Sequence, residues 1–313
     1  MSSTSGNTPP NAAQMAQRAQ VSCPGSIFSN YRDVGSTVLR DGSLIPLPYH
    51  NYDGNALIIW GLADADWVRG RLQGQPWQPV LSPDGRAHVQ VWAVQYHNCN
   101  AGGPYREVIV LFSTCPAAAK VAPVDSPMKL LPLYDDKVAN PYCYKIWLDR
   151  QLPLDYGREI LGTDKYLDKA MKIDWTGDRN VDLECNHVAG ELHETGPPGP
   201  LIRGSLRLQD GMHLGSVIGA YGLGRALGMA AGSRSSWQVV TPPGIIDRPN
   251  SRALGNPVFD FHYETSPKFT SARDAGGKLE YSGELGQCGF SASLYQHDPH
   301  VRTVILSPFS FTP

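Results

Sequence analysis

The hydrophobic and polar positions of the chain follow the pattern of short strands joined by turns. From about Leu44 onward, short apolar runs alternate with Gly, Pro, Asn and Asp, the residues that most often interrupt strands. Four runs are rich in β-branched and aromatic residues and predict strands over 55–62, 87–97, 106–114 and 142–149. We therefore expect this part of the chain to be built mainly of strands.

Helical patterns are few. Residues 63–74 form the first credible helix, because Trp67, Val68 and Leu72 fall on one side and Gly74 stands near its end. Further strands are predicted in the last third of the chain, over 256–266, 277–285, 290–297 and 302–311. Strands and helices do not alternate regularly, so the pattern predicts a mostly antiparallel β protein with a few helices. Such a protein forms either a closed barrel or layered sheets.

Two regions depart from this pattern. Residues 1–22 are polar and lack the apolar centre of a signal peptide, which predicts a disordered tail. The stretch 176–215 is polar and rich in turns, and 213–232 is an apolar segment of small residues that suits a strand running into a helix. We expect one domain over 23–313, with an expanded insertion around 176–250 that serves as a lid or a partner surface.

Composition and charge narrow the classes of partner. The 313 residues include 27 Lys and Arg against 29 Asp and Glu, a net charge of −2 that predicts neither nucleic acid nor an anionic membrane as a partner. The sequence has no run of about 18 apolar residues of the kind that spans a membrane. The six cysteines have no CxxC spacing, so we expect free thiols in a cytoplasmic protein and no zinc site.

Several short motifs suggest a cofactor only weakly. The sequence GLGRALG (222–228) has the glycine spacing of a dinucleotide loop, but no strand-helix-strand unit surrounds it, and close backbone packing explains it equally. His187, Glu191 and His193 would share one face of a strand and could bind a metal, although ordinary surface or core positions are more common for these residues. No Ser or Cys stands in a nucleophile-elbow motif. We expect neither a metal nor a cofactor.

Lys165 is a candidate for a different kind of chemistry. The strand-like stretch 142–156 is followed by Gly-Arg-Glu and then by Lys165, and the pattern of 165–175 predicts one or two helical turns or a surface loop. A lysine amine has an ordinary pKa of about 10.4 and is then protonated and unreactive. Burial among apolar groups removes the proton, and the free amine can attack a ketone to form an imine. A lysine in this position is nevertheless more often an ordinary surface residue.

The order of residues around Lys165 resembles the active-lysine region of the acetoacetate decarboxylase family. The chain has Trp147-Leu148-Asp149, then Gly157-Arg158-Glu159, then Lys165, with gaps that match those of the family. A second matching segment, 96–112, places an aromatic residue, Tyr105, two positions before Glu107. The resemblance implies a closed antiparallel β-barrel with a few flanking helices, an imine-forming Lys165, Glu107 as its acid-base partner, no cofactor and a homo-oligomer.

The sequence also departs from the family pattern at the predicted site. The second lysine that follows the family's nucleophile is replaced by Tyr166, and a family glutamate falls at or near Trp92. The family arginine that contacts the substrate carboxylate falls near Tyr52 or Asp53. We therefore expect a cavity that is larger or more apolar than one built for acetoacetate.

The residues that contact the substrate follow from these departures. Trp92, Tyr105 and Tyr166 are the expected cavity walls, and Arg158 is a candidate substrate-binding residue. An ion pair between Arg158 and Glu159 that braces the barrel wall is the alternative, because buried charges are usually paired.

Three functions fit the sequence. The first is decarboxylation of a bulky β-keto acid through an imine on Lys165. The second keeps this small-molecule carbonyl chemistry but uses the imine for an aldol, dehydration, isomerisation or cyclisation step. The third is a barrel that binds an apolar ligand without chemistry, in which Lys165 stays protonated.

Overall fold

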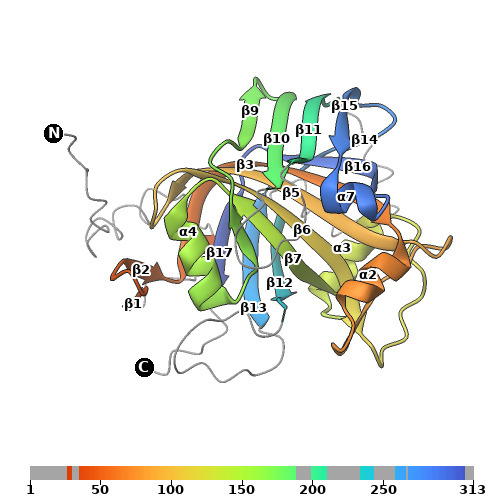
Figure 1. The fold of residues 1–313 in the computed structure, drawn as a ribbon, viewed down its shortest axis with the longest axis horizontal. Helices are drawn as coiled ribbons and strands as arrows, with labels where there is room; N and C mark the ends of the chain where they lie inside the picture. Colours follow the sequence, from red (N-terminus) through yellow and green to blue (C-terminus); the bar gives the residue numbers. More distant parts are fainter. Residues whose placement is uncertain are drawn as a thin grey trace.

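The computed structural model describes residues 27–29, 35–187, 199–209, 233–242, 258–265 and 267–306. Strands account for most of these residues, and the helices are short and lie at the margins of the sheets (Figure 1). The apolar runs favour strands because they are short and rich in Val, Ile and aromatic side chains. The prediction of a mainly β protein is confirmed.

Seven strands form a closed ring. In the order in which they pair, they are β3 (Tyr49–Ala63), β5 (Ala87–Cys99), β6 (Tyr105–Pro116), β7 (Asn140–Leu148), β12 (Ser233–Val240), β13 (Val258–Thr265) and β17 (Arg302–Leu306), which pairs with β3 again. The pairing of β12 with β7 is parallel and joins Val240 to Tyr142, and every other pairing in the ring is antiparallel. The predicted closed antiparallel barrel is confirmed, with one parallel seam.

Side chains of the ring strands alternate between the barrel interior and a second apolar layer. On β5, Trp92, Val94 and Tyr96 belong to the interior cluster, whereas Val91 and Ala93 belong to a cluster outside the barrel. Successive side chains of a strand point to opposite faces, so a strand that is buried on both faces loses its polar positions. This explains why the strand sequences are apolar almost throughout.

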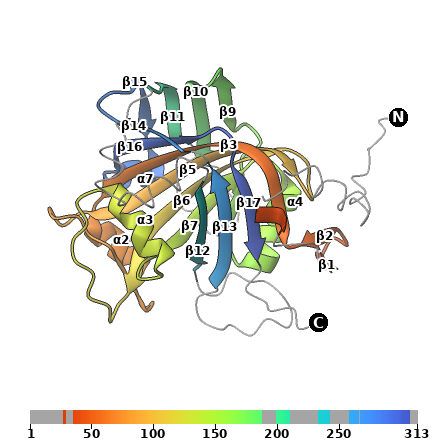
Figure 2. The same cartoon turned by 180° about the vertical axis from the view of Figure 1, so that it is seen from behind.

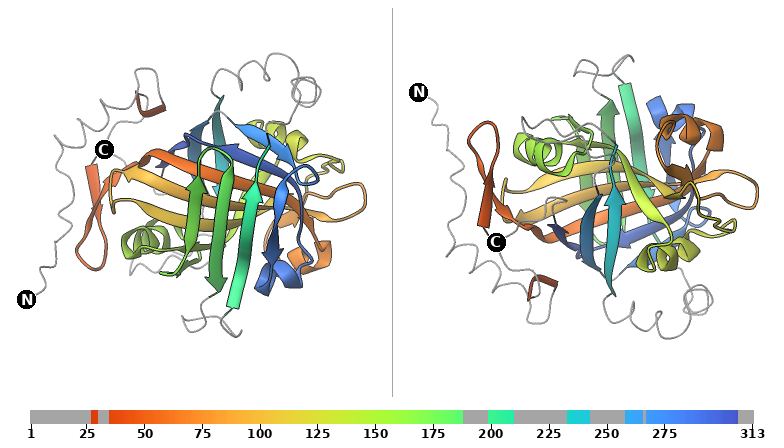
Figure 3. Two further views of the ribbon diagram at one scale, coloured as in Figure 1. Left: turned by 90° about the horizontal axis from the view of Figure 1, so that it is seen from above. Right: turned by 90° about the horizontal axis from the view of Figure 1, so that it is seen from below.

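A four-stranded sheet covers part of the outer face of the barrel. It consists of β15 (Gly276–Tyr281), β11 (Gly199–Arg207), β10 (Asn180–His187) and β9 (Lys172–Thr176), in this order. Its Ile173, Leu183 and Ile202 pack in one cluster with Val91 and Val108 of the barrel. Seen from above, its strands lie across those of the barrel (Figure 3).

Smaller strands extend the barrel wall. β16 (Ser291–Asp298) pairs with β3, β14 (Lys268–Ser271) pairs with β16, and β4 (Trp77–Pro79) pairs with β6. The hairpin of β1 (Gly35–Val38) and β2 (Leu44–Leu47) lies at the end of the molecule near helix α4 (Gln151–Tyr156) (Figure 1). Ile45 and Leu47 of this hairpin are buried in the interior cluster, which ties the hairpin to the barrel.

The remaining helices and turns lie around the barrel. Helix α2 (Ala65–Arg71) begins at Asp64, whose side chain accepts a hydrogen bond from the Trp67 amide, and it confirms the helix predicted over 63–74. The others are η1 (Ile27–Ser29), η2 (Pro127–Lys129), α3 (Leu130–Asp135), the π-helix η3 (Gly157–Leu161) and α7 (Gly283–Gln287). Figure 2 shows α3 beside the barrel, at the side where β12 and β13 lie. No helix among the described residues is long and apolar enough to cross a membrane.

The segment after the Gly-Arg-Glu motif was predicted wrongly. Residues 165–175, expected as helical turns or a loop, instead form β8 (Lys165–Leu167) and most of β9. Three residues are too few to show an alternation in the sequence, and β8 is a strand because it pairs in parallel with β7. The region 176–250, expected as an insertion, includes β10, β11 and the barrel strand β12. The tail 1–22 and the segment 213–232 lie outside the described residues.

Candidate active site

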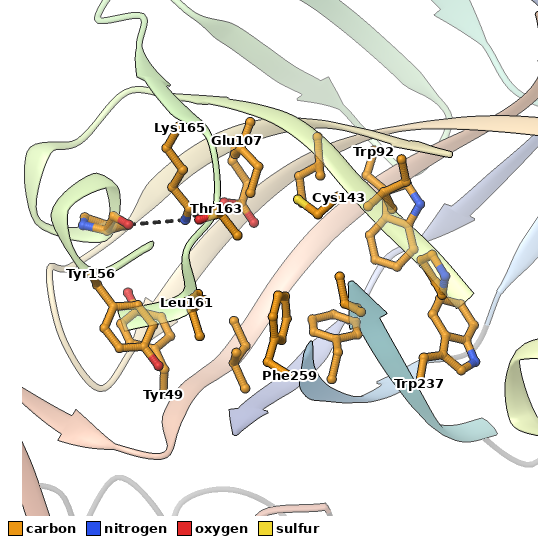
Figure 4. A pocket seen from close by; sticks show the side chains of 18 of the residues that line it. Tyr49, Trp92, Glu107, Cys143, Tyr156, Leu161, Thr163, Lys165, Trp237 and Phe259 are labelled. Atoms are coloured by element: carbon orange, nitrogen blue, oxygen red, sulfur yellow. Dashed lines mark hydrogen bonds and ion pairs between the residues drawn. The ribbon is translucent and has the colours of Figure 1, made fainter. Parts of the chain in front are cut away.

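The interior of the barrel contains a cavity next to β8. It encloses about 640 Å³ of space between atoms, which includes space open to solvent. Its walls are mainly aromatic and aliphatic, and Lys165 and Glu107 are the only Lys, Arg, Asp or Glu among its described lining residues. Figure 4 shows these two side chains at one end of the cavity and Trp92 and Trp237 at the other.

Strand β8 places the Lys165 side chain inside the barrel. Lys165 pairs with Ile146 of β7, and the Ile146 amide donates to the Asp164 carbonyl at 2.8 Å. The chain reaches this strand through the π-helix η3, which ends at Gly162 in the left-handed region (φ 69°), where glycine is favoured. Only 5% of Lys165 is exposed, so the amine is held away from bulk water.

Glu107 is the charged partner of Lys165. It comes from β6, is also 5% exposed, and its Oε2 lies 3.8 Å from Lys165 Nζ. The amine also donates to the Pro153 carbonyl at 3.2 Å (Figure 4). The side chain of Tyr96 forms a hydrogen bond with the Glu107 carboxyl group. The two groups therefore lie close enough to exchange a proton through a small adjustment or one bound molecule.

Burial shifts the pKa of each group in the direction that favours its neutral form. Burial lowers the pKa of the Lys165 amine, and the negative charge of Glu107 opposes this by raising it. Burial raises the pKa of the Glu107 carboxyl group, and the positive charge of Lys165 opposes this by lowering it. With one proton between them, the pair is either charged on both sides or consists of a free amine and a neutral acid. Burial favours the second form, in which the amine is a nucleophile.

Gly157 makes room for the Lys165 side chain. A Cβ atom at position 157 would lie 2.1 Å from Lys165 Cε and 2.7 Å from Thr163 Oγ1. The backbone of Gly157 is helical (φ −62°, ψ −45°), so the requirement for glycine here is space and not conformation. The glycine of the Gly-Arg-Glu motif thus leaves the space that the Lys165 side chain occupies.

We expect Gly157→Ala to displace the amine while the barrel stays folded. A shift of about 1 Å in a reacting group can reduce the rate about 100-fold. The measurement is the rate of borohydride trapping of a ketone on Lys165, together with the thermal midpoint of unfolding. Gly70→Ala is the matched control, because Gly70 lies in helix α2 and a Cβ there would meet nothing within 4 Å. Equal trapping rates for the two variants would contradict the prediction.

Arg158 contacts the backbone of Lys165 and is not among the residues that line the cavity. Its Nε donates to the Lys165 carbonyl at 2.8 Å, and its Nη2 donates to the same oxygen. The Glu159 carboxylate accepts a hydrogen bond from the Arg40 amide at 3.0 Å, which connects η3 to the turn between β1 and β2. Arg158 thus holds the strand that carries the lysine and does not contact the cavity as a substrate-binding residue would.

We expect Arg158→Met to loosen β8, because a hydrogen bond from a charged donor is worth about 1.5–3 kcal/mol. The free energy of unfolding in urea should fall by this amount, and the trapping rate at Lys165 should fall with it. Arg158→Lys, which keeps one charged donor, should recover part of both. If Arg158→Met raised only the substrate concentration needed for half-saturation, the residue would contact substrate instead.

Two of the three predicted wall residues line the cavity and the third does not. Trp92 and Tyr105 line the cavity. Tyr166, predicted as a wall, lies on the opposite face of β8, where its ring stacks on Trp147 at 5.8 Å and its hydroxyl donates to Asp164. This prediction was wrong because adjacent residues of a strand face opposite sides. Once Lys165 points inward, Tyr166 must point outward.

Much of the aromatic wall of the cavity was not predicted from the sequence. Trp237 and Val239 of β12, Phe259 and Phe261 of β13, and Tyr49 and Tyr156 line the cavity. The alternation of Phe259, Phe261 and Tyr263 was a usable signal, since it marks one face of a strand. Trp237 gave no such signal, because its strand lies in the region that was expected to be an insertion.

The candidates for metal and nucleotide binding lie largely outside the described residues. Among the described residues, no group of three or more His, Cys, Asp or Glu side chains is arranged to hold a metal ion. His297 is buried and stacks on Trp175 at 4.2 Å. The predicted candidates Glu191 and His193, and the GLGRALG segment, lie outside the described residues. The five described cysteines are buried free thiols.

Solved structures share the arrangement of the barrel. Acetoacetate decarboxylase from Legionella pneumophila matches with a TM-score of 0.51 and 12% sequence identity, over 83% of this chain and 85% of that one. The enduracididine biosynthesis enzyme MppR, solved with pyruvate, matches with a TM-score of 0.50 and 12% identity, over 90% of this chain and 100% of that one. No protein-family model and no curated sequence matches the chain. The chain therefore has the acetoacetate decarboxylase-like fold, as its sequence predicted.

Proposed function

We propose that the protein is a cofactor-free lyase that forms an imine between Lys165 and a β-keto acid with an apolar tail. The observation that carries the proposal is the buried Lys165 amine, 3.8 Å from the Glu107 carboxyl group in an otherwise apolar cavity. Such burial favours the free amine that attacks a carbonyl carbon. The fold, shared with acetoacetate decarboxylase, is consistent with this chemistry.

The chemistry begins with formation of the imine. The Lys165 nitrogen bonds to the ketone carbon, and the carbonyl oxygen takes up two protons and leaves as water, with Glu107 as the nearby acid. In the protonated imine, the bond to the carboxylate breaks and its electron pair neutralises the nitrogen, which gives CO2 and an enamine. The enamine carbon takes a proton from Glu107, and water then releases the ketone. One proton from solvent is consumed overall.

An apolar cavity favours this loss of CO2. The substrate carboxylate loses its charge as the carbon–carbon bond breaks, so surroundings that stabilise the charge poorly lower the barrier relative to water. The absence of a further cation from the described lining residues is consistent with such an environment. Figure 4 shows Trp92 and Trp237 at the end of the cavity away from Lys165, so an apolar tail of the substrate would lie between these rings and the amine.

A condensation or dehydration on the same imine is the second candidate. It is favoured by the same lack of a second cation, because a substrate without a carboxylate would be accepted as readily. MppR, whose fold is similar, was solved with pyruvate, which is not a β-keto acid. In a condensation, the protonated imine loses a proton from its α carbon to give the enamine, whose carbon bonds to a second carbonyl carbon while the oxygen of that carbonyl takes up a proton. In a dehydration, the enamine expels a hydroxyl group from its β carbon as water, with Glu107 as the nearby acid.

Borohydride trapping tests the proposal. The protein is incubated with a series of β-keto acids and β-diketones, reduced, digested and analysed by mass spectrometry. An adduct on Lys165 supports imine formation, its mass shows whether CO2 has left, and analysis of the released products separates the two candidates. If no carbonyl compound gives an adduct on Lys165, the imine is excluded and ligand binding without chemistry becomes the better explanation.

A further inference from the structure

A chain of buried polar side chains leads from Glu107 across the inner face of the barrel. The Tyr96 hydroxyl forms hydrogen bonds with the Glu107 carboxyl group and with the Thr303 side chain. The Asn51 amide donates to Thr303 Oγ1 at 2.7 Å. Asn51 and Thr303 are 0% exposed and Tyr96 is 2% exposed, and none of the three is among the described residues that line the cavity. They can therefore act on a bound molecule only through the residues that line it, such as Glu107.

The register of four neighbouring strands brings these groups together. Glu107 on β6 lies two residues from the partner of Tyr96 on β5, so both side chains are on the same face. On the other side of β5, Tyr96 pairs with Gly54 of β3, where a Cβ atom would lie 3.2 Å from Tyr96 Cδ1. Thr303 of β17 pairs with Asn51 of β3. The missing side chain at Gly54 leaves the Tyr96 ring space to lie against β3 and reach Thr303.

The amide at the end of the chain determines which way the hydrogen bonds run. Asn51 Nδ2 can only donate, so Thr303 Oγ1 accepts from it. The Thr303 proton is then directed to the Tyr96 oxygen, because it would otherwise be buried without an acceptor. Tyr96 in turn donates its single proton to Glu107. Each donor polarises the next one, which strengthens the last hydrogen bond of the chain.

The groups around Glu107 act on its proton in opposite directions. Burial raises the pKa of Glu107, the positive charge of Lys165 and the hydrogen bond from Tyr96 lower it, and the negative charge of Asp149 raises it. Burial raises the pKa of each of the other titratable groups near Glu107 and keeps them neutral: Tyr49, Tyr105 and Cys143. Tyr96 is thus a neutral group that helps a buried acid to release its proton.

We propose that Tyr96, held by Thr303 and Asn51, is a positioning residue that orients the Glu107 carboxyl group for proton transfer beside Lys165. The proposal rests on the imine function of Lys165. The oxygen that accepts from Tyr96 is the carbonyl oxygen of the neutral acid, which leaves the acid proton on the second oxygen. Glu107 Oε2 lies 3.8 Å from Lys165 Nζ, and Figure 4 shows the two side chains at the same end of the cavity. Glu107 is thereby set to protonate the oxygen that leaves as water.

Tyr96→Phe removes the donor and keeps the ring, which packs on Tyr105 at 4.8 Å. The measurement is the rate of borohydride trapping of a β-diketone on Lys165 between about pH 5 and pH 10. The charged form of Glu107 loses a donor, so the alkaline limb of the profile should move up by about one pH unit. The acid limb, where Glu107 is neutral, should stay near its wild-type position. An unchanged alkaline limb overturns the proposal, and a limb at lower pH overturns it because Glu107 would then donate to Tyr96.

Thr303 supplies a matched pair of variants that leave Tyr96 and Glu107 in place. Thr303→Val keeps the shape without the hydroxyl, so it should move the alkaline limb in the same direction by a smaller amount. Thr303→Ser keeps the hydroxyl and should retain the wild-type profile. Tyr142→Phe is the control for a merely structural hydroxyl, because Tyr142 donates to Gln75 at 2.9 Å and does not line the cavity. It should lower the thermal midpoint of unfolding and move neither limb. Equal profiles for Thr303→Val and Thr303→Ser overturn the chain.

A titration without substrate separates this proposal from the function on which it rests. Carbon-13 NMR of protein labelled at the glutamate carboxyl carbons follows Glu107 directly, and Glu107→Gln identifies its signal. The midpoint of this titration should rise by about one pH unit in Tyr96→Phe. If no carbonyl compound gives an adduct on Lys165, the imine is excluded, and a raised midpoint still supports the control of Glu107 by Tyr96. A midpoint that is unchanged or lower overturns the proposal, whether or not an adduct forms.

Discussion

Replacing Lys165 by methionine should abolish imine trapping while the barrel stays folded. Methionine has a similar length and no branch, so it fills the same space without the amine. The remaining Glu107 should not be left as an isolated buried charge. The positive charge of Lys165 lowers the pKa of Glu107, so its loss raises that pKa further and the carboxyl group takes up a proton. The adduct should fall to the level found on exposed lysines.

A double variant tests whether the buried pair costs stability. Burying an amine and a carboxyl group is costly, and replacing even a fully charged buried pair by neutral groups of similar size often leaves a protein equally stable, or more stable by about 1–4 kcal/mol. We expect the double variant Lys165→Met with Glu107→Gln to resist urea at least as well as the wild type. Lys129→Met is the control, since Lys129 forms an exposed ion pair with Asp125 and its loss should change neither trapping nor stability measurably. Wild-type turnover by Lys165→Met would refute the proposed role.

The second large effect concerns the pH dependence of imine formation. The reactive form of the wild-type pair has a free amine and a neutral acid, so the rate should pass through a maximum as pH rises. Below the maximum the amine is protonated, and above it Glu107 has lost its proton. Glu107 raises the pKa of Lys165 only through its negative charge, and it is neutral on the acid limb, so the neutral variant Glu107→Gln should leave the acid limb of the profile near its wild-type position. The alkaline limb should disappear with the titrating acid.

The same variant should also be slow, because loss of a positioned acid typically reduces rates about 10²-fold to 10⁴-fold. The measurement is the rate of adduct formation on Lys165 with a β-diketone between pH 5 and pH 10, in roughly half-unit steps. Glu280→Gln is the control, since Glu280 is exposed and pairs with Arg203 at the surface. An unchanged profile in Glu107→Gln would show that the two groups are not coupled.

The predictions from sequence were correct for features that depend on residues close to one another in the chain. Strands such as β5 and β6 are visible because their branched and aromatic residues favour extended backbone over many positions. The helix α2 is visible because Trp67, Val68 and Leu72 fall on one side of it and Gly74 stands near its end. Lys165 and Glu107 were found through a resemblance in spacing, and the structure brings them together inside the barrel.

The predictions failed where pairing between distant segments decides the structure. Strand β8 has only three residues, and it is a strand because it pairs in parallel with β7. That pairing turns Tyr166 away from the cavity, which no count of aromatic residues along the chain could indicate. Closure of the ring by β12 and β7 brings Trp237 to the far end of the cavity, although its strand lies within the stretch that looked like an insertion.

The sequence by itself determined the strand content, the scarcity of helix and the spacing of the motif that ends at Lys165, because these depend on side chains within a few residues of one another. The tertiary structure alone decided which strands close the barrel, how far the amine lies from Glu107 and why residue 157 is glycine. These features depend on register and close packing between segments that a local pattern does not bring together, most of them tens to hundreds of residues apart.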